Sequence, residues 1–212
     1  MCTNIIIANE RARWGRSRLR VRHAETFFHK HKFPFSSFTT GYRGHARELA
    51  ADAATQEVST VVVIGGDGTV NEVINGILAS GCHKIPHIGI IPSGCSNDFS
   101  KSLGIPQQLR KACRTIMNGR TRYVDVGQAG RHYFCMASSL GLLADISSES
   151  LHMNGFSGSL RYIIAALSVI RKMPTGWAMS IRANGRVFRG TCSVLMEEGG
   201  DFSNHSPFAT EL

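Results

Sequence analysis

Short apolar runs alternate with helix-like segments over roughly the first 120 residues. Three short runs are typical of strands buried on both faces of a parallel sheet: the β-branched runs at 4–8 and 60–64 and the apolar run at 87–91. A further strand-like segment covers residues 35–40. Between them lie helical patterns, the clearest of which has the spacing of a core-facing helix at Val70, Val73, Ile74, Ile77 and Leu78. This alternation predicts an α/β domain over residues 1–125, with a doubly wound, mostly parallel sheet and helices on both faces.

The pattern changes after this domain. Strand-like runs over 123–146 are interrupted by a turn near Gly130, which predicts a hairpin. A helical stretch follows over about 158–172, and two alternating strands then flank Asn184–Gly185, a dipeptide typical of tight hairpins. These features predict a partial, β-rich and antiparallel C-terminal domain over residues 126–212.

Composition narrows the class of protein. No segment approaches the roughly 18 apolar residues that a membrane span requires, and the N-terminus lacks the basic start and apolar run of a signal peptide, so we predict a cytoplasmic location. Six cysteines without a CxxC pair indicate reduced thiols. Cys82, His83 and His87 fit no zinc pattern, so no metal-ligating residues are predicted.

Positive charge is concentrated near the N-terminus. The formal net charge is +9, and the first 50 residues contain ten Lys and Arg against three acidic residues. Six arginines alternate through residues 11–22, a pattern that suits nucleotide phosphates, nucleic acid or an anionic membrane surface, or that forms a solvated helix face. Few aromatic side chains are interleaved with them, so we expect peripheral contact with an anionic membrane and no nucleic-acid partner.

A glycine-rich turn follows the predicted strand at 60–64. Gly65, Gly66 and Gly68 allow a ligand to approach the backbone closely. A helix that starts near Thr69 would offer its N–H groups and positive dipole end to an anion. Asp67 would repel a bare phosphate, which implies a bridging Mg2+ or a hydrogen bond to backbone or ribose. Alternatively, the segment is only a tight turn with Thr69 as the N-cap.

A second turn decides between these interpretations. It contains Pro92, Gly94, Asn97 and Asp98 and lies beside the first turn in the predicted sheet. GGDGTxNEV followed by P-x-G-[TS]-x-N-D-F resembles the diacylglycerol kinase catalytic-domain family, which includes bacterial lipid kinases and the sphingosine and ceramide kinases. The segments "TGYRGHARELA" and "YVDVGQAGRHYF" resemble further motifs of that family.

The resemblance implies an ATP- and Mg2+-dependent kinase that acts on a lipid hydroxyl of the diacylglycerol type. It also implies that the α/β domain over residues 1–125 binds the nucleotide and that residues 126–212 form part of a β-sandwich substrate domain. Carried over by position, the residues implied to form the ATP site are Asn9, Thr40, Gly65, Gly66, Asp67, Gly68, Thr69, Val70, Asn71, Glu72, Gly94, Cys95, Asn97 and Asp98.

The chain departs from the family pattern at several positions. Glu10 replaces a proline, Met136 replaces an asparagine, and Cys95 replaces a threonine or serine hydroxyl with a weaker hydrogen-bonding group. The family's catalytic base and Mg2+ ligands lie beyond the position of Leu212, so the resemblance implies no catalytic residue in this chain. We therefore expect ATP binding without appreciable lipid phosphorylation. We also expect self-association through the unpaired edge of the second domain.

Two other interpretations stay open. The chain is alternatively a non-catalytic remnant that binds nucleotide or membrane. NAD kinases also share the GGDG turn, but they lack the second motif, which disfavours an NAD kinase-like function.

Overall fold

The computed structural model describes residues 4–12, 17–152, 159–172, 177–183, 186–192 and 194–198. The chain divides into two compact units, Met1–Val124 and Asp125–Leu212, which are described separately. Within the described ranges, no helix combines the length and the apolar character that crossing a membrane requires.

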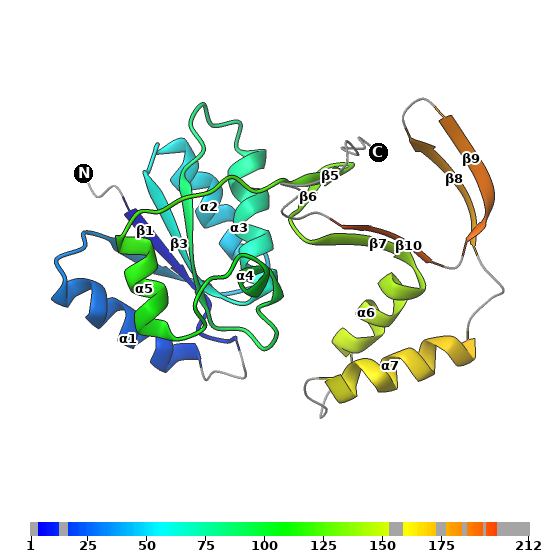
Figure 1. Ribbon diagram of the computed structural model, residues 1–212, viewed down its shortest axis with the longest axis horizontal. Coiled ribbons are helices and arrows are strands. Elements are labelled where there is room, and N and C mark those ends of the chain that lie inside the picture. Colours follow the sequence, from blue (N-terminus) through cyan, green and yellow to red (C-terminus); the bar gives the residue numbers. More distant parts are fainter. Residues whose placement is uncertain are drawn as a thin grey trace. The chain divides into compact units, whose positions relative to one another are not determined.

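The first unit is built on a four-stranded, entirely parallel sheet (Figure 1). Its strand order is β2-β1-β3-β4, and the strands are β1 (Asn4–Ala8), β2 (Ser36–Thr39), β3 (Thr60–Gly65) and β4 (His87–Pro92). Ala8 lies opposite both Thr39 and Ile64, and Gly65 lies opposite Pro92, so the four carboxyl ends line up at one edge. The predicted parallel sheet is confirmed.

Helices cover both faces of this sheet, which confirms the doubly wound arrangement (Figure 1). One face is covered by α1 (Ser17–Lys30) and α5 (Leu109–Met117), and the other by α2 (His45–Thr55) and α3 (Asp67–Ala79). The short helix α4 (Asp98–Ser102) follows β4. Because strand side chains alternate, Ile6, Val62 and Ile64 share one face, where they pack with Phe28 and Cys113.

The helices α2 and α3 pack closely enough for their backbones to touch. The buried positions of α2 are all small: Ala46, Ala50, Ala53 and Ala54. A Cβ at Gly76 of α3 would overlap the carbonyl oxygen of Arg47, so only a glycine fits at this crossing. This contact joins the helix after β2 to the helix after β3.

The second unit is antiparallel in all the strand pairs that the described residues form. These pairs are β5 (Gly127–Ala129) with β6 (His132–Phe134), β7 (Ala137–Gly141) with β10 (Val194–Glu198), and β8 (Trp177–Ala183) with β9 (Arg186–Cys192). The β5–β6 and β8–β9 pairs confirm the two predicted hairpins, although Asn184–Gly185 itself lies outside the described residues.

Two helices complete the described part of the second unit. The helix α7 (Ser159–Lys172) agrees with the predicted helical stretch. The strand-like interpretation of 123–146 is wrong from Leu142 onward, where α6 (Leu142–His152) begins. A short apolar run cannot be distinguished from a helix segment by periodicity alone, which explains the error.

Candidate functional site

The turn after β3 and the turn after β4 touch backbone to backbone. A Cβ at Gly66 would lie 2.9 Å from the Cα of Gly94, and a Cβ at Gly94 would overlap the Cα of Gly66. The amide of Ser93 donates a 2.7 Å hydrogen bond to the carbonyl oxygen of Gly65. A side chain at either contact glycine would force the two turns apart. The expectation that both turns lie at the same sheet edge is therefore correct.

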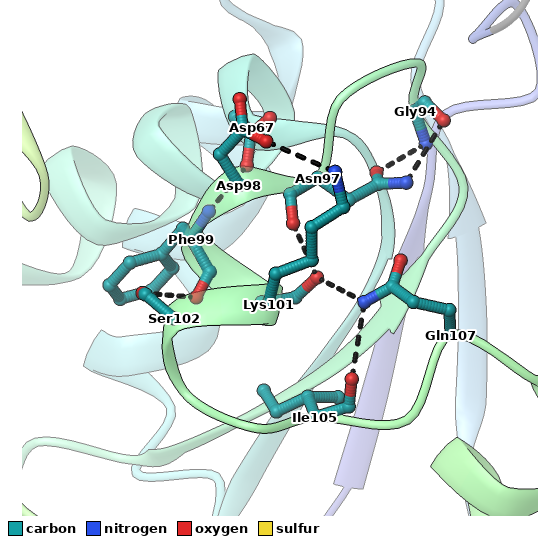
Figure 2. A network of polar contacts seen from close by, with 10 residues as sticks. Asp67, Gly94, Asn97, Asp98, Phe99, Lys101, Ser102, Ile105 and Gln107 are labelled. Carbon is teal, nitrogen blue, oxygen red and sulfur yellow. Dashed lines mark hydrogen bonds and ion pairs between the residues drawn. The ribbon is translucent and has the colours of Figure 1, made fainter.

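Asp67 joins the two turns through its side chain. Its Oδ1 accepts a 3.1 Å hydrogen bond from the backbone N–H of Phe99, in the first turn of α4 (Figure 2). Amides in the first turn of a helix lack intrahelical partners, so this carboxylate satisfies a group that would otherwise need water. Of the roles that the sequence left open for Asp67, the structure shows the hydrogen bond to backbone.

Asn97 fixes the conformation of the second turn. Its backbone is left-handed, with φ 53° and ψ 43°, a region that asparagine tolerates better than most residues. Its Oδ1 accepts a 2.7 Å bond from the N–H of Gly94, and its Nδ2 donates a 3.0 Å bond to the carbonyl oxygen of Gly94 (Figure 2). Asn97 thus positions Gly94 against Gly66. The neighbouring Asp98 forms an exposed 3.2 Å ion pair with Lys101.

The helix α3 begins two residues earlier than the sequence predicted. Gly66 is its N-cap, and the carbonyl oxygen of Gly66 accepts hydrogen bonds from Thr69 and Val70, at 3.0 and 3.1 Å. Thr69 therefore lies inside the first turn, and its alternative assignment as the N-cap is wrong. Its side chain fills the space above Gly65, where a Cβ would lie 2.6 Å from the Cβ of Thr69.

Asn9 connects the end of β1 to this first helical turn. Its backbone N–H donates a 2.8 Å bond to the carbonyl oxygen of Ile64, and its Nδ2 donates a 3.0 Å bond to Oγ1 of Thr69. Its Oδ1 accepts a 3.1 Å bond from the backbone N–H of Arg11. One side chain thereby holds the loop after β1 against the glycine turn.

A cleft of about 380 Å³ opens at this edge of the first unit. Its walls come from the loops after β1, β2 and β3 and from the starts of α2 and α3. The lining residues are Asn9, Arg11, Ala12, Thr40, Tyr42, Arg43, Ala46, Gly66, Gly68, Thr69 and Glu72. A ligand in this cleft would face the N-terminal end of α3, where backbone N–H groups and the helix dipole favour an anion.

Six of the predicted site residues line this cleft, namely Asn9, Thr40, Gly66, Gly68, Thr69 and Glu72. The others lie beside or behind it. Gly65 and Val70 are buried, and Gly94 and Asn97 support the glycine turn, as does Asp67. The exposed residues Asn71, Cys95 and Asp98 do not line the cleft.

Sequence reasoning included Arg11 in a stretch suited to phosphates but did not assign it to the ATP site, and it missed Arg43. Arg11 and Arg43 both line the cleft, and both are exposed. They supply the positive charge that the glycine turn lacks, from loops that follow β1 and β2. Their position just after a predicted parallel strand was a usable signal, because such loops meet at one sheet edge.

Tyr42 is a further lining residue that the sequence did not identify. Its ring stacks on the imidazole of His45, with centroids 4.6 Å apart and planes 9° from parallel. Its hydroxyl donates a hydrogen bond to the carboxylate of Glu48. This hydrogen bond is the main reason that the pKa of Tyr42 is raised, so the phenol stays protonated.

Comparison with known proteins identifies related chains. A sequence model of the diacylglycerol kinase catalytic domain matches residues 3–129. The chain is 32% identical over 172 residues to a diacylglycerol kinase of Bacillus subtilis (strain 168), covering 80% of this chain and 55% of that protein. It is 34% identical over 165 residues to a diacylglycerol kinase of Staphylococcus carnosus (strain TM300), covering 77% and 53%.

A solved structure shares the fold. A diacylglycerol kinase from Bacillus anthracis str. Sterne superposes with a TM-score of 0.71 at 25% identity, covering 94% of this chain and 64% of that chain. Compared with the two sequence relatives above, the present chain spans about half of their length.

The different surroundings of Gly66 and Gly68 generate a first prediction. We expect Gly66→Ala to destabilise the protein by about 1–3 kcal/mol, because its methyl group would press on Gly94. Gly68 has nothing within 4 Å of a Cβ position and no left-handed φ. We therefore expect Gly68→Ala to be neutral or stabilising by up to about 1 kcal/mol. Thermal denaturation followed by circular dichroism measures both; equal melting temperatures for the two variants would contradict the contact.

Cys95 yields a second prediction, because the family resemblance implies that this position contacts ATP. We therefore expect ATP to slow alkylation of the exposed Cys95 thiol at pH 8, measured by mass spectrometry of its peptide. Cys113 is an internal control, since burial raises the pKa of its thiol to about 11 and keeps it protonated at that pH. An alkylation rate of Cys95 that does not change with ATP would place the nucleotide away from this residue.

Proposed function

The chain belongs to the diacylglycerol kinase catalytic-domain family, and from this premise we propose that its first unit binds ATP in the cleft at the carboxyl edge of the sheet. The observation that carries the proposal is the convergence of Gly66, Gly68, Arg11 and Arg43 on one cavity. Glycine backbone allows close approach of a phosphate, and the arginines offset its charge. The names of the relatives indicate that the family's phosphoryl acceptor is a lipid hydroxyl of the diacylglycerol type, and we expect this chain to bind ATP without appreciable transfer to it.

The electrostatics of the cleft suit a polyphosphate. The described lining contains two arginines and one carboxylate, that of Glu72. The cleft also lies at the N-terminal end of α3, which is the positive end of the helix dipole. Phosphoryl transfer depends mainly on positioning and on stabilising the charge of the phosphates. The chain's own contribution is then to hold the phosphates against a preorganised turn.

The donor groups near the glycine turn fit Mg2+ as part of a nucleotide complex. Mg2+ in such sites is held by one or two carboxylates together with phosphate oxygens and water. Glu72 lines the cleft, and Asp67 uses only Oδ1 in its hydrogen bond to Phe99. The described residues form no group of three or more potential metal ligands. When bound, Mg2+ neutralises the charge that develops on the phosphates.

The third prediction tests ATP binding by replacing the two arginines that line the cleft. Arg11→Gln and Arg43→Gln should each weaken ATP binding roughly tenfold, because a hydrogen bond to a charged group is lost. Arg110→Gln is the matched control, since Arg110 is exposed on α5 and outside the cleft lining. Isothermal titration calorimetry with Mg-ATP, with NAD as a competitor, measures the affinities.

The outcomes separate the arginine roles from the function itself. Failure of the unaltered protein to bind ATP, or preferential binding of NAD, would refute the proposed function. ATP affinities of the cleft variants equal to that of Arg110→Gln would leave the function standing but remove the arginines from it.

We further propose that a basic face of the first unit contacts an anionic membrane, where a lipid substrate would reside. This face consists of α1 and α5, which pack against each other. Their exposed cations are Arg18, Arg22, Lys30, Arg110, Lys111 and Arg114, and the two helices contain a single acidic residue, Glu25. Arg13 and Arg16 of the arginine-rich stretch lie outside the described residues.

The fourth prediction concerns this basic face. The protein should pellet with vesicles that contain anionic phospholipid, and binding should fall with salt, since each cation near the surface contributes about 1 kcal/mol and is screened. Replacing Arg22, Lys111 and Arg114 by glutamine should abolish most of this binding. Equal binding to neutral vesicles at every salt concentration would show that the arginines only face solvent.

A further inference from the structure

Among the described residues that line the cleft, Tyr42 alone has an aromatic ring. The side chain lines the cavity and is 57% exposed. Its ring therefore does not contribute to the hydrophobic core. Its neighbour Arg43 and the glycine turn are the anion-attracting parts of the same cavity. The ring therefore provides a chemically distinct end to the cleft.

The ring is held in place by two residues of α2. His45 stacks beneath it, and Glu48 accepts a hydrogen bond from its hydroxyl. His45 is itself oriented, because its Nδ1 accepts a 3.0 Å hydrogen bond from the backbone N–H of Gly41. A ring fixed at one face and at its hydroxyl loses little conformational entropy when a ligand stacks on it.

The loops that carry Tyr42 and the glycine turn start at a separation comparable to the length of a nucleotide. Tyr42 follows β2, Gly66 follows β3, and β1 lies between these strands. Neighbouring strands are spaced by about 4.8 Å, so the loops after β2 and β3 start about 10 Å apart. This separation is comparable to the span between the base and the terminal phosphates of a nucleoside triphosphate.

We propose that Tyr42 is the stacking platform for the base of the nucleotide and makes the site prefer purines. One ring face is occupied by His45, and the base stacks on the remaining exposed part of the ring while the phosphates lie at Gly66 and Gly68. Stacking on an aromatic ring does not require base-specific hydrogen bonds, so preference follows the area of the π system. This assignment rests on the proposed nucleotide binding and names the part of the cleft that receives the base.

The test compares ATP with inorganic tripolyphosphate, which carries the phosphates but no base. With the 212-residue protein in calorimetry, Tyr42→Leu should bind ATP roughly five- to a hundredfold more weakly, the range expected for losing one base–aromatic stack. Its affinity for tripolyphosphate should not change. Tyr42→Phe, which keeps the ring and loses the bond to Glu48, should retain most of the ATP affinity.

A control and a second measurement complete the design. Tyr123→Leu makes the same substitution at a fully exposed tyrosine outside the cleft lining and should leave both affinities unchanged. The preference of the unaltered protein for ATP and GTP over CTP and UTP should shrink in Tyr42→Leu. Circular dichroism melting curves of all variants confirm that each one folds.

Each result decides between defined alternatives. Unchanged ATP affinity in Tyr42→Leu would overturn the platform while leaving nucleotide binding intact. An equal loss of ATP and tripolyphosphate affinity would show that Tyr42 only shapes the loop, which also overturns the platform. If the unaltered protein binds neither probe, the proposed function itself fails.

Discussion

The contact between the Gly66 and Gly94 backbones is the constraint on which the rest of the site depends. Two loops from neighbouring strands can touch in this way only because neither residue carries a Cβ. The carboxylate of Asp67 then bridges from the first turn to the amide of Phe99, and Asn97 binds both backbone groups of Gly94. These four residues thus hold the two turns together beside the cleft.

Three loops contribute different groups to the cleft. The turn after β3 supplies close backbone approach and a helix dipole, whereas the loops after β1 and β2 supply the guanidinium groups of Arg11 and Arg43. A lysine inside the glycine turn is unnecessary when neighbouring loops bring cations to the same cavity. Asn9 makes this division stable, since its side chain bonds to Thr69 and to the backbone of Arg11.

Periodicity and turn chemistry were sufficient to predict the parallel sheet and the meeting of the two glycine turns, because alternating strands and helices favour parallel strands and the carboxyl ends of parallel strands share one edge. They did not reveal Tyr42 or Arg43, whose roles depend on where an irregular loop directs its side chains. The start of α3 was misplaced because its N-cap, Gly66, has no side chain to mark the boundary. The helix α6 was missed because its first residues continue an apolar run that began in β7.

The close packing of α2 on α3 has a consequence for ligand choice. Gly76 lies against the carbonyl oxygen of Arg47, so these helices cannot approach further, and the buried side chains of α2 are all alanines. This contact therefore limits how closely the helix after the Tyr42 loop can approach the helix that begins at the glycine turn. For the proposed nucleotide, this limit means that Tyr42 and the glycine turn are engaged together only by a ligand whose aromatic and anionic groups are spaced to match.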